Sequence, residues 1–527
     1  MVALSDLPPE CIIYILLFLV PHEIARCNMV SRSLWKIINH SPSLQYLLEL
    51  ERLGFMAPHS SSNRLSLDEK VQVLKEKRLR MNTSDPTAMS LNTYDYKHVI
   101  APKFSRSYMS HGVLALDGQN EPNQLGIYQL SSRNRDIGFD HYTLDSLPPH
   151  QAIAFEPAFD LLVLYDSTDD GEIFHLRSLR TGLPHPATTL PRVFYAGDNA
   201  TGSRVAQIDN PVVIIGRRIA FVRCFTNSPE SIIKIWEWTS GDTISSTKVL
   251  GSSFAFLSED VFVVRTPLSW TSQSTLPLVV YTCDGIPPGG HARLLARFHL
   301  PESRNTTVLH STELLPASTS PVCHCDALLT SPSLIYDLSP ASYYLALNVS
   351  LLTGSGGGPG TLFIHSSSLL ELACSLNTQL NNDAEASVPW SEWGFITSWI
   401  GPPDLKTASE YGPGIFGHLA SFMHADEQMN VWRVEVYDLR TTTTTPSELP
   451  PKETSHFPRN QEAASFFGDS PRPLKNPALV KSFTIPFETI PSKRAWNPAR
   501  YRRPMEIMTD DEHVVILLLY IPGAIRY

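Results

Sequence analysis

The sequence has few features that would place it in a membrane, in the secretory pathway or in a catalytic family. Its longest apolar run near the N-terminus, Cys11–Val20, is too short to cross a bilayer. Acidic Asp6 and Glu10 precede this run instead of a basic segment, so we expect no signal peptide. No G-x-S-x-G nucleophile motif occurs. We therefore expect no membrane partner, no cofactor and no enzymatic activity.

Paired cysteines and excess positive charge are also missing. The seven cysteines are scattered and odd in number, which argues against a disulfide framework and for a reducing compartment, the cytoplasm or the nucleus. A formal net charge of −10 gives the chain as a whole no attraction to nucleic acid. What the chain does contain is 42% hydrophobic and 18% charged residues, the composition of a folded, sheet-rich protein.

Residues 4–44 predict three short helices. Pro8 and Pro9 fit only the first turn of a helix, and the residues that follow are apolar nearly all round. Pro21 ends this helix, a second follows it, and Ser31 can cap a third. Three helices of this length cannot bury two apolar faces on themselves, so the apolar surface that is left indicates a partner.

The same stretch resembles the F-box motif in order and spacing. The matching residues are Leu7-Pro8-Pro9-Glu10, Ile15-Leu16, Leu19, Val30-Ser31-Arg32, Trp35 and Ser41-Pro42. The resemblance is to the large group of fungal F-box proteins, which combine an N-terminal F-box with a C-terminal β domain. It implies a subunit of a cullin-type (SCF) ubiquitin ligase that docks to a Skp-type adaptor and, through it, to cullin. The implied adaptor-binding residues are Leu7, Pro8, Ile12, Leu16, Leu19, Val30, Ser31 and Trp35.

A helical extension is predicted after this motif. Residues 43–54 continue as a helix with Gly54 at its end, and Leu67–Met81 has the pattern of an amphipathic helix. Its cations are expected to form a solvated face and not a binding patch; they are Lys70, Lys75, Lys77, Arg78 and Arg80. The expected boundaries are 1–46 for the F-box, 47–91 for the extension and 92–527 for the β domain.

From about residue 92 the apolar pattern changes from helical to alternating. Strand-like runs recur, each followed by a turn. Ile233–Asp242, with an aromatic-acidic pair before a glycine turn, resembles the outer strand and turn of a propeller blade, and weaker echoes occur at 179–182, 280–285 and 436–441. The absence of parallel crossover helices leaves a sandwich or a propeller. We favour a large antiparallel β-propeller of six to eight blades, because radial repetition removes long exposed edges. The expected fold class is thus α+β and multidomain.

Two C-terminal stretches have separate expected roles. Thr441–Pro477 contains five successive threonines, seven prolines and no periodicity, so we expect a disordered insertion. Val514–Ile521 predicts a buried strand, suited to closing the ring against a strand from the N-terminal side.

Three local motifs suggest chemistry, and for each a structural explanation is favoured. Glycine-rich Thr353–Gly360 leads into a strand, which indicates a hairpin and not a phosphate loop. Cys323-His324-Cys325 has no second ligand pair, so no metal is expected. The carboxylates of Asp169-Asp170 and Asp510-Asp511-Glu512 are typical of turns.

A fourth motif, Lys493–Arg503, interleaves five cations with two aromatic residues. Such a run can hold RNA, or a phosphorylated or acidic peptide. The alternative, which the acidic charge of the whole chain favours, is a solvated loop. The candidate target-binding residues are Trp496, Arg500, Arg502 and Arg503.

The predicted function is substrate recruitment, in which the F-box docks to the adaptor and the β domain holds a target protein. One alternative is a scaffold that binds the adaptor without delivering a target. Another is a propeller enzyme or sugar-binding module. Copurification of cullin would favour substrate recruitment over the scaffold. Two convergent buried carboxylates at the central channel would favour the propeller enzyme or sugar-binding module. The identity of the target does not follow from the fold.

Overall fold

The computed structural model describes twenty-one segments of the chain. These are residues 7–58, 65–82, 107–110, 112–117, 123–168, 171–196, 205–206, 211–225, 228, 230–251, 253–266, 277–300, 308–315, 335–352, 359–379, 386–400, 413–426, 431–442, 477–486, 506–509 and 512–517.

The N-terminal part is helical. Its elements are α1 (Pro9–Leu16), α2 (Pro21–Cys27), α3 (Arg32–His40), α4 (Pro42–Leu53), the short strand β1 (Phe55–Met56) and α5 (Leu67–Asn82). Proline opens α1, α2 and α4. The Ser31 hydroxyl accepts a hydrogen bond from the backbone N–H of Leu34 at 3.1 Å and so caps α3. α4 ends at Gly54, whose φ of 73° favours glycine. The predicted start of α1, the Ser31 cap and the stop at Gly54 are confirmed, but α1 ends at Leu16, and Pro21, which was predicted to end it, opens α2 instead.

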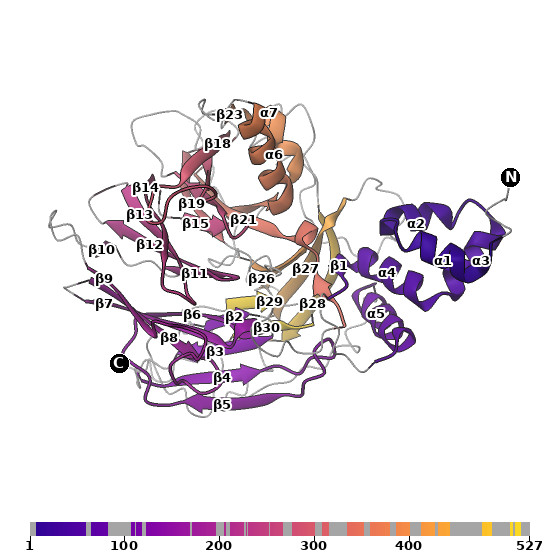
Figure 1. The fold of residues 1–527 in the computed structure, drawn as a ribbon, viewed down its shortest axis with the longest axis horizontal. Coiled ribbons are helices and arrows are strands. Elements are labelled where there is room, and N and C mark those ends of the chain that lie inside the picture. Colours follow the sequence, from indigo (N-terminus) through magenta and orange to yellow (C-terminus); the bar gives the residue numbers. More distant parts are fainter. Residues whose placement is uncertain are drawn as a thin grey trace.

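The remainder is a β-propeller of six blades, arranged around a common centre (Figure 1). Blade 1 is β2 (Ser107–Ser110), β3 (Val113–Asp117), β4 (Leu125–Gln129) and β5 (Asp140–Leu144). Blade 2 is β6 (Ala152–Glu156), β7 (Leu161–Thr168), β8 (Gly171–Ser178) and β9 (Arg192–Ala196). Blade 3 is β10 (Val205–Ala206) and β11 (Val212–Ile215), which both pair with β12 (Arg218–Phe225), then β13 (Glu230–Glu237) and β14 (Thr243–Leu250).

Blade 4 is β15 (Ser253–Phe256), β16 (Val261–Arg265), β17 (Pro277–Thr282) and β18 (Arg293–His299). Blade 5 is β19 (Val308–Leu315), β21 (Tyr344–Leu352), β22 (Pro359–His365) and β24 (Thr397–Ile400), and blade 6 is β25 (Gly414–Phe416), β26 (Leu419–Asp426), β27 (Val431–Thr442) and β28 (Pro477–Pro486). Within each blade these strands pair antiparallel with their neighbours, as predicted.

One hydrogen bond recurs in every blade. A backbone N–H at the end of the third strand donates to the carbonyl of the residue immediately before the second strand. The six bonds are Leu130 to Gly112 (2.8 Å), Leu179 to Asp160 (2.8 Å), Trp238 to Arg217 (3.1 Å), Cys283 to Asp260 (2.7 Å), Ser366 to Tyr343 (3.0 Å) and Leu439 to His418 (2.8 Å). The blades are therefore structural repeats. The echoes seen in the sequence lie on or just after the third strand of their blades. The prediction that they mark the outer strand is therefore wrong.

Hydrophobic clusters join each blade to the next. Between blades 2 and 3, Phe174 of β8 meets Phe221 of β12 and Trp236 of β13 edge to face, with ring centroids 5.1 and 4.9 Å apart. Similar clusters lie between blades 1 and 2, 3 and 4, 4 and 5, and 5 and 6. Because aromatic rings bury large apolar areas, this packing supplies the core of the ring.

The ring closes through a separate hairpin. β29 (Glu506–Thr509) pairs with β30 (Val514–Leu517) and contacts β25 and β26 of blade 6. The Glu512 carboxylate accepts hydrogen bonds from the backbone N–H groups of Arg133 (3.1 Å) and Asn134 (3.2 Å) in blade 1. Among the described residues, β30 pairs with β29 and with no N-terminal strand, and the contact with blade 1 is made by the Glu512 side chain. The predicted pairing with an N-terminal strand is thus not found in this part of the chain.

Blade 5 contains an insertion that the sequence pattern did not reveal. Between its third and fourth strands lie α6 (Ser366–Gln379), the strand β23 (Ala386–Val388) and α7 (Trp390–Trp393). β23 adds to blade 4 as a fifth strand, parallel to β18. The glycine-rich stretch does join antiparallel strands, since Ser350 of β21 pairs with Pro359 of β22. A hairpin is thus the correct account of that motif.

The proline- and threonine-rich segment joins two strand ends that are already adjacent. Thr442 of β27 pairs with Pro477 of β28, and residues 443–476 between them lie outside the described residues. We expect that replacing 443–476 by a short Gly/Ser turn will leave the Tm of the propeller unchanged within a few degrees, because loop closure costs vary slowly with length. Differential scanning calorimetry would measure this, and a collapse in soluble yield would contradict it.

Candidate functional site

The N-terminal helices have a small core of their own. Ile12 and Leu16 of α1 are each 4% exposed and pack with apolar side chains of the other three helices, which are Ile24, Ile38, Leu44 and Leu48. Leu7 and Leu19 pack partly against this core. Ile12 and Leu16, which the F-box resemblance implies as adaptor-binding residues, are therefore buried in the core that holds the helices together.

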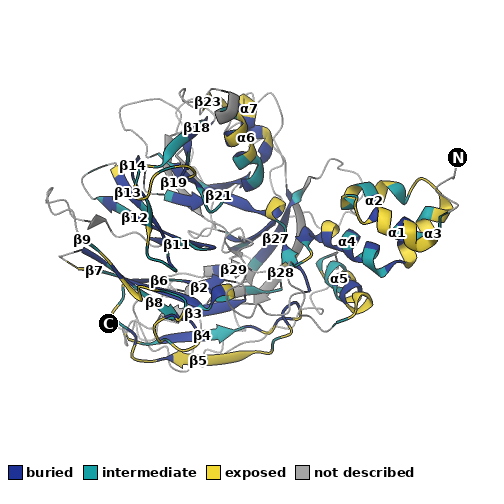
Figure 2. Ribbon diagram, in the orientation of Figure 1, coloured by how far each residue is buried: buried dark blue, intermediate teal, exposed yellow. Residues whose placement is uncertain are grey.

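The same helices also carry exposed apolar residues, and Figure 2 shows much of α1–α3 coloured as exposed. Half of the exposed large hydrophobic residues in the described part of the chain lie within this short region; they are Tyr14, Ile15, Leu17, Phe18, Val20, Met29, Val30 and Trp35. Phe18 is 74% exposed, and its ring packs edge to face on Tyr14 at 5.1 Å. Apolar side chains gathered on so small a unit are typical of a protein-interaction site.

Four of the predicted adaptor-binding residues stay at or near this surface. Pro8 and Ser31 are exposed, Val30 is 73% exposed and Trp35 is 51% exposed. Ser31 has the structural task of capping α3. Sequence reasoning did not assign the other exposed apolar residues to adaptor binding; these are Tyr14 and Ile15 of α1, Leu17, Phe18 and Val20 after its end, and Met29. We call the exposed residues 14–35 listed above the apolar helical surface.

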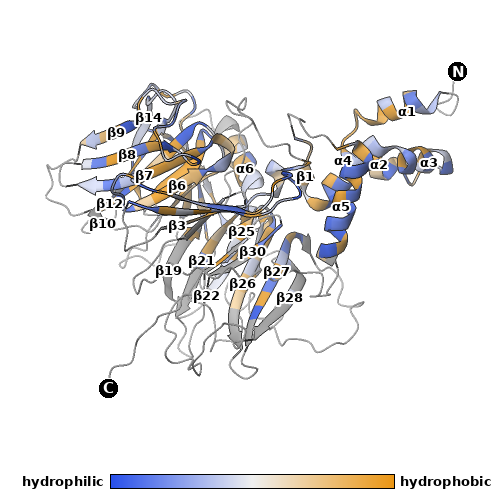
Figure 3. Cartoon of the chain, turned by 90° about the horizontal axis from the view of Figure 1, so that it is seen from below, coloured by the Kyte–Doolittle hydropathy of each residue, from blue (hydrophilic) through white to orange (hydrophobic). Residues whose placement is uncertain are grey.

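α4 connects the helices to the propeller. Leu44 and Leu48 belong to the helical core, whereas Tyr46 and Leu50 pack with Tyr336 and other residues at the edge of the propeller. β1 continues this contact by pairing with β20 (Asp337–Leu338), and the Tyr46 hydroxyl donates to the Ile335 carbonyl. Figure 3 shows α1–α3 standing clear of the sheets beyond α4 and α5. A boundary at residue 46 would cut α4, which runs unbroken from Pro42 to Leu53.

A buried ionic contact joins α4 to α5. The Glu49 carboxylate, 1% exposed, accepts from Arg52 at 2.7 Å and from Arg78 at 3.0 Å. Lys77 donates to the Tyr336 hydroxyl at 2.9 Å, and Lys70 is buried. The prediction of a fully solvated basic face on α5 is wrong for these residues, since three of its cations fasten the helix to α4 or to the propeller.

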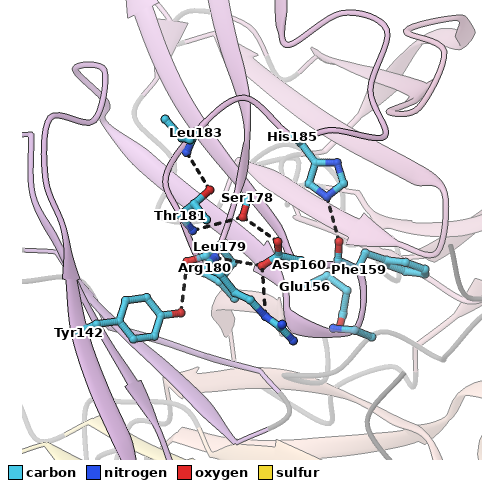
Figure 4. A network of polar contacts seen from close by, with 11 residues as sticks. Tyr142, Glu156, Phe159, Asp160, Ser178, Leu179, Arg180, Thr181, Leu183 and His185 are labelled. Atoms are coloured by element: carbon cyan, nitrogen blue, oxygen red, sulfur yellow. Dashed lines mark hydrogen bonds and ion pairs between the residues drawn. The ribbon is translucent and has the colours of Figure 1, made fainter. Parts of the chain in front are cut away.

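A polar network lies at the turns of blade 2 (Figure 4). Ser178 donates to the Asp160 carboxylate at 2.6 Å, and His185 lies nearby. The His185 Nε2 atom bonds to the Phe159 carbonyl at 2.9 Å, and its Nδ1 accepts from the Ala187 N–H at 3.2 Å. A nucleophilic serine needs a histidine within hydrogen-bond reach. This histidine is occupied by backbone on both sides, so the network fastens turns together and is not a catalytic triad.

Several predicted site residues lie outside the described residues. These are the candidate target-binding residues Trp496, Arg500, Arg502 and Arg503, together with Cys323-His324-Cys325, Asp169-Asp170 and Asp510-Asp511. In the described part of the chain, no group of three His, Cys, Asp or Glu side chains could hold a metal ion. Among the same residues, none of the helices is long and apolar enough to span a bilayer.

Comparison with known proteins gives no family. No family model matches the sequence, and no curated protein is significantly similar to it. Among solved structures, the WD40 domain of Toxoplasma gondii coronin aligns over 63% of this chain and 66% of its own, with 12% identity and a TM-score of 0.32. TolB from Acinetobacter baumannii aligns over 62% and 61%, with 11% identity and a TM-score of 0.30. Kluyveromyces lactis Hsv2 aligns over 36% and 60%, with 11% identity and a TM-score of 0.24.

This chain thus spans about two thirds of the coronin domain and less of the other two. Superpositions at these TM-scores carry no argument about function. The propeller assignment follows from strand order and from the turn bond repeated in each blade.

Proposed function

We propose that this protein is the substrate-recognition subunit of a cullin-type ubiquitin ligase, in which the apolar helical surface docks to a Skp-type adaptor and the propeller holds a target protein. The observation that carries the proposal is the apolar helical surface itself, on a unit that extends away from the ring (Figure 1). The F-box-like order of residues 7–42 in the sequence supports the identity of the partner.

The energetics of such a surface favour a stable complex. Burying an aromatic or large aliphatic side chain contributes roughly 1.5–3 kcal/mol, so a few of these residues suffice for micromolar binding. Because the core residues Ile12 and Leu16 lie on the other side of α1, docking needs no rearrangement of the helices. Propellers present broad, rigid surfaces, which suits the propeller to holding a protein target.

Phe18→Asp is expected to weaken binding of a recombinant Skp-type adaptor by about 30-fold or more, since it removes roughly 2 kcal/mol of apolar burial and places a charge in the contact. The Tm should not change, because Phe18 is largely exposed. Isothermal titration calorimetry would measure the affinity. The matched control is Leu250→Asp, which likewise replaces an exposed apolar residue by aspartate, but on β14 of the propeller.

Unchanged adaptor binding by Phe18→Asp, or equal loss in both variants, would contradict this assignment. Cullin capture by the wild-type chain in the presence of the adaptor separates a ligase subunit from a scaffold. If Phe18→Asp abolishes cullin capture but a target protein still copurifies and accumulates in cells, substrate recruitment is supported.

A further inference from the structure

One face of blade 2 carries two arginines and a histidine. His175 and Arg177 lie two residues apart on β8 and so share a face. His175 pairs across the sheet with Arg192 of β9. The pKa of His175 is lowered to about 4, first by burial and then by the charges of both arginines and of His150. His175 is therefore neutral at pH 7, and we call the two arginines, Arg177 and Arg192, the cationic row.

Neither arginine of the cationic row forms an ion pair in the described part of the chain. Arg177 donates to the Gly182 carbonyl at 3.3 Å, and Arg192 is exposed. The carboxylate nearest in register on this face is Asp166 of β7, which lies opposite Ile173 at the other end of β8. On the neighbouring strand β9, Ile173 pairs with Phe194, whose side chain is 50% exposed. The surface therefore offers positive charge next to an aromatic ring.

β9 is also an edge strand. Among the described residues it pairs with β8 alone. The Leu176 N–H donates to the Pro191 carbonyl at 2.9 Å, so Pro191 points toward β8. Because alternate residues of an antiparallel strand point to opposite sides, the N–H and C=O groups of Arg192 and Phe194 point away from β8. These are the groups that an added strand would use.

The same chain shows how a blade edge is covered. On blade 4, the three residues of β23 lie against the edge strand β18, with Ala386 opposite Ala296 and Val388 opposite Phe298. A short extended segment is thus enough to complete a blade. On blade 2, no such segment from the described residues covers β9.

We infer that β9 receives an extended acidic segment of a partner protein, which adds to blade 2 as a fifth strand while its carboxylates pair with the cationic row. Main-chain hydrogen bonds would supply affinity, and Arg192 and Arg177 would select acidic side chains spaced at alternate residues. An apolar residue of the same segment would pack on Phe194. The inference is independent of adaptor docking.

The test uses the full chain without adaptor and a short fluorescent peptide of alternating glutamate and valine. Fluorescence anisotropy should show binding that weakens with added salt. The Arg177→Ala/Arg192→Ala variant should bind about fivefold more weakly or worse, since each exposed ion pair contributes a factor of roughly 1.5 to 5. The matched control is Lys248→Ala, which removes an exposed cation from the edge strand β14 of the next blade and should bind as the wild type does.

A second peptide tests the added strand. In an extended peptide, the N–H groups of alternate residues point to opposite sides. N-methylation of the set that would face β9 should abolish binding, and N-methylation of the other set should leave binding unchanged. Full binding by both methylated peptides would overturn strand addition. The inference would be overturned if the glutamate peptide did not bind, or if Lys248→Ala weakened its binding as much as the double arginine variant does. Tighter binding of a lysine–valine peptide, a phosphoserine peptide or a polyuridine RNA would also overturn it. None of these results would bear on the adaptor titration.

Discussion

Leu16→Asp is expected to unfold α1–α3 while leaving the propeller folded. The side chain is 4% exposed within the helical core, so the change loses the burial of a leucine and places an unpaired carboxylate among apolar groups, at a cost of about 4 kcal/mol or more. A unit with so small a core cannot absorb that cost. Hydrogen exchange of residues 9–40 should rise to that of an unfolded chain, and exchange in the third strands of the blades should not change.

The control for this variant is Leu17→Asp at the neighbouring position, which is 40% exposed and should keep α1–α3 protected. Adaptor binding is expected to fail in Leu16→Asp through unfolding and in Phe18→Asp through loss of contact. Protected helices in Leu16→Asp would mean that α1 is turned differently on its neighbours. The two variants thus separate the core of the helical unit from its surface.

Removing both arginines that contact Glu49 is expected to destabilise the α4–α5 contact by about 3–5 kcal/mol. Arg52→Ala/Arg78→Ala removes both cations from a carboxylate that is 1% exposed in the wild-type chain, and a buried charge left without partners is costly. The urea midpoint of the far-ultraviolet circular dichroism signal should fall accordingly, because α4 and α5 are among the longest helices of the described residues.

Adding Glu49→Leu to this double variant provides a sharp control. The triple variant has no buried charge and a leucine of similar volume, so most of the lost stability should return. If it is as unstable as the double variant, the arginines act through packing of their aliphatic stems on α4 and not through the carboxylate.

The sequence was most informative where one residue decides the local backbone. Proline at the first turn of α1, Ser31 at a cap and Gly54 at a left-handed position were interpreted correctly. Pro21 was not, because a proline can follow the end of one helix or open the next, and here it opens α2. The inward side of α1 could not be read in the same way, because its residues are apolar nearly all round. Only the positions of α2–α4 decide that Leu16 points inward and Phe18 outward.

Two features required tertiary information for other reasons. α6 opens with three serines, which favour caps and turns over helix interiors, and it is stabilised by packing of Leu369 and Ala373 on its neighbours. The cationic row is present in the sequence within His175-x-Arg177 and Arg192-x-Phe194, two alternating pairs. The two pairs come together only through the register of β8 with β9, and fourteen residues separate Arg177 from Arg192 in the sequence.

α4 also acts as a lever arm. Its twelve residues span about 18 Å, with one end fixed in the propeller edge and the other in the helical core. A tilt of about 10° at the propeller end would move the far end by roughly 3 Å over that length, and a partner docked beyond it by more. Tyr46 and Phe55 pack at the propeller edge and are not part of the apolar helical surface or of the cationic row. Substitutions there are therefore expected to change where a partner docked on the helices lies relative to the ring, without removing any of its own contacts.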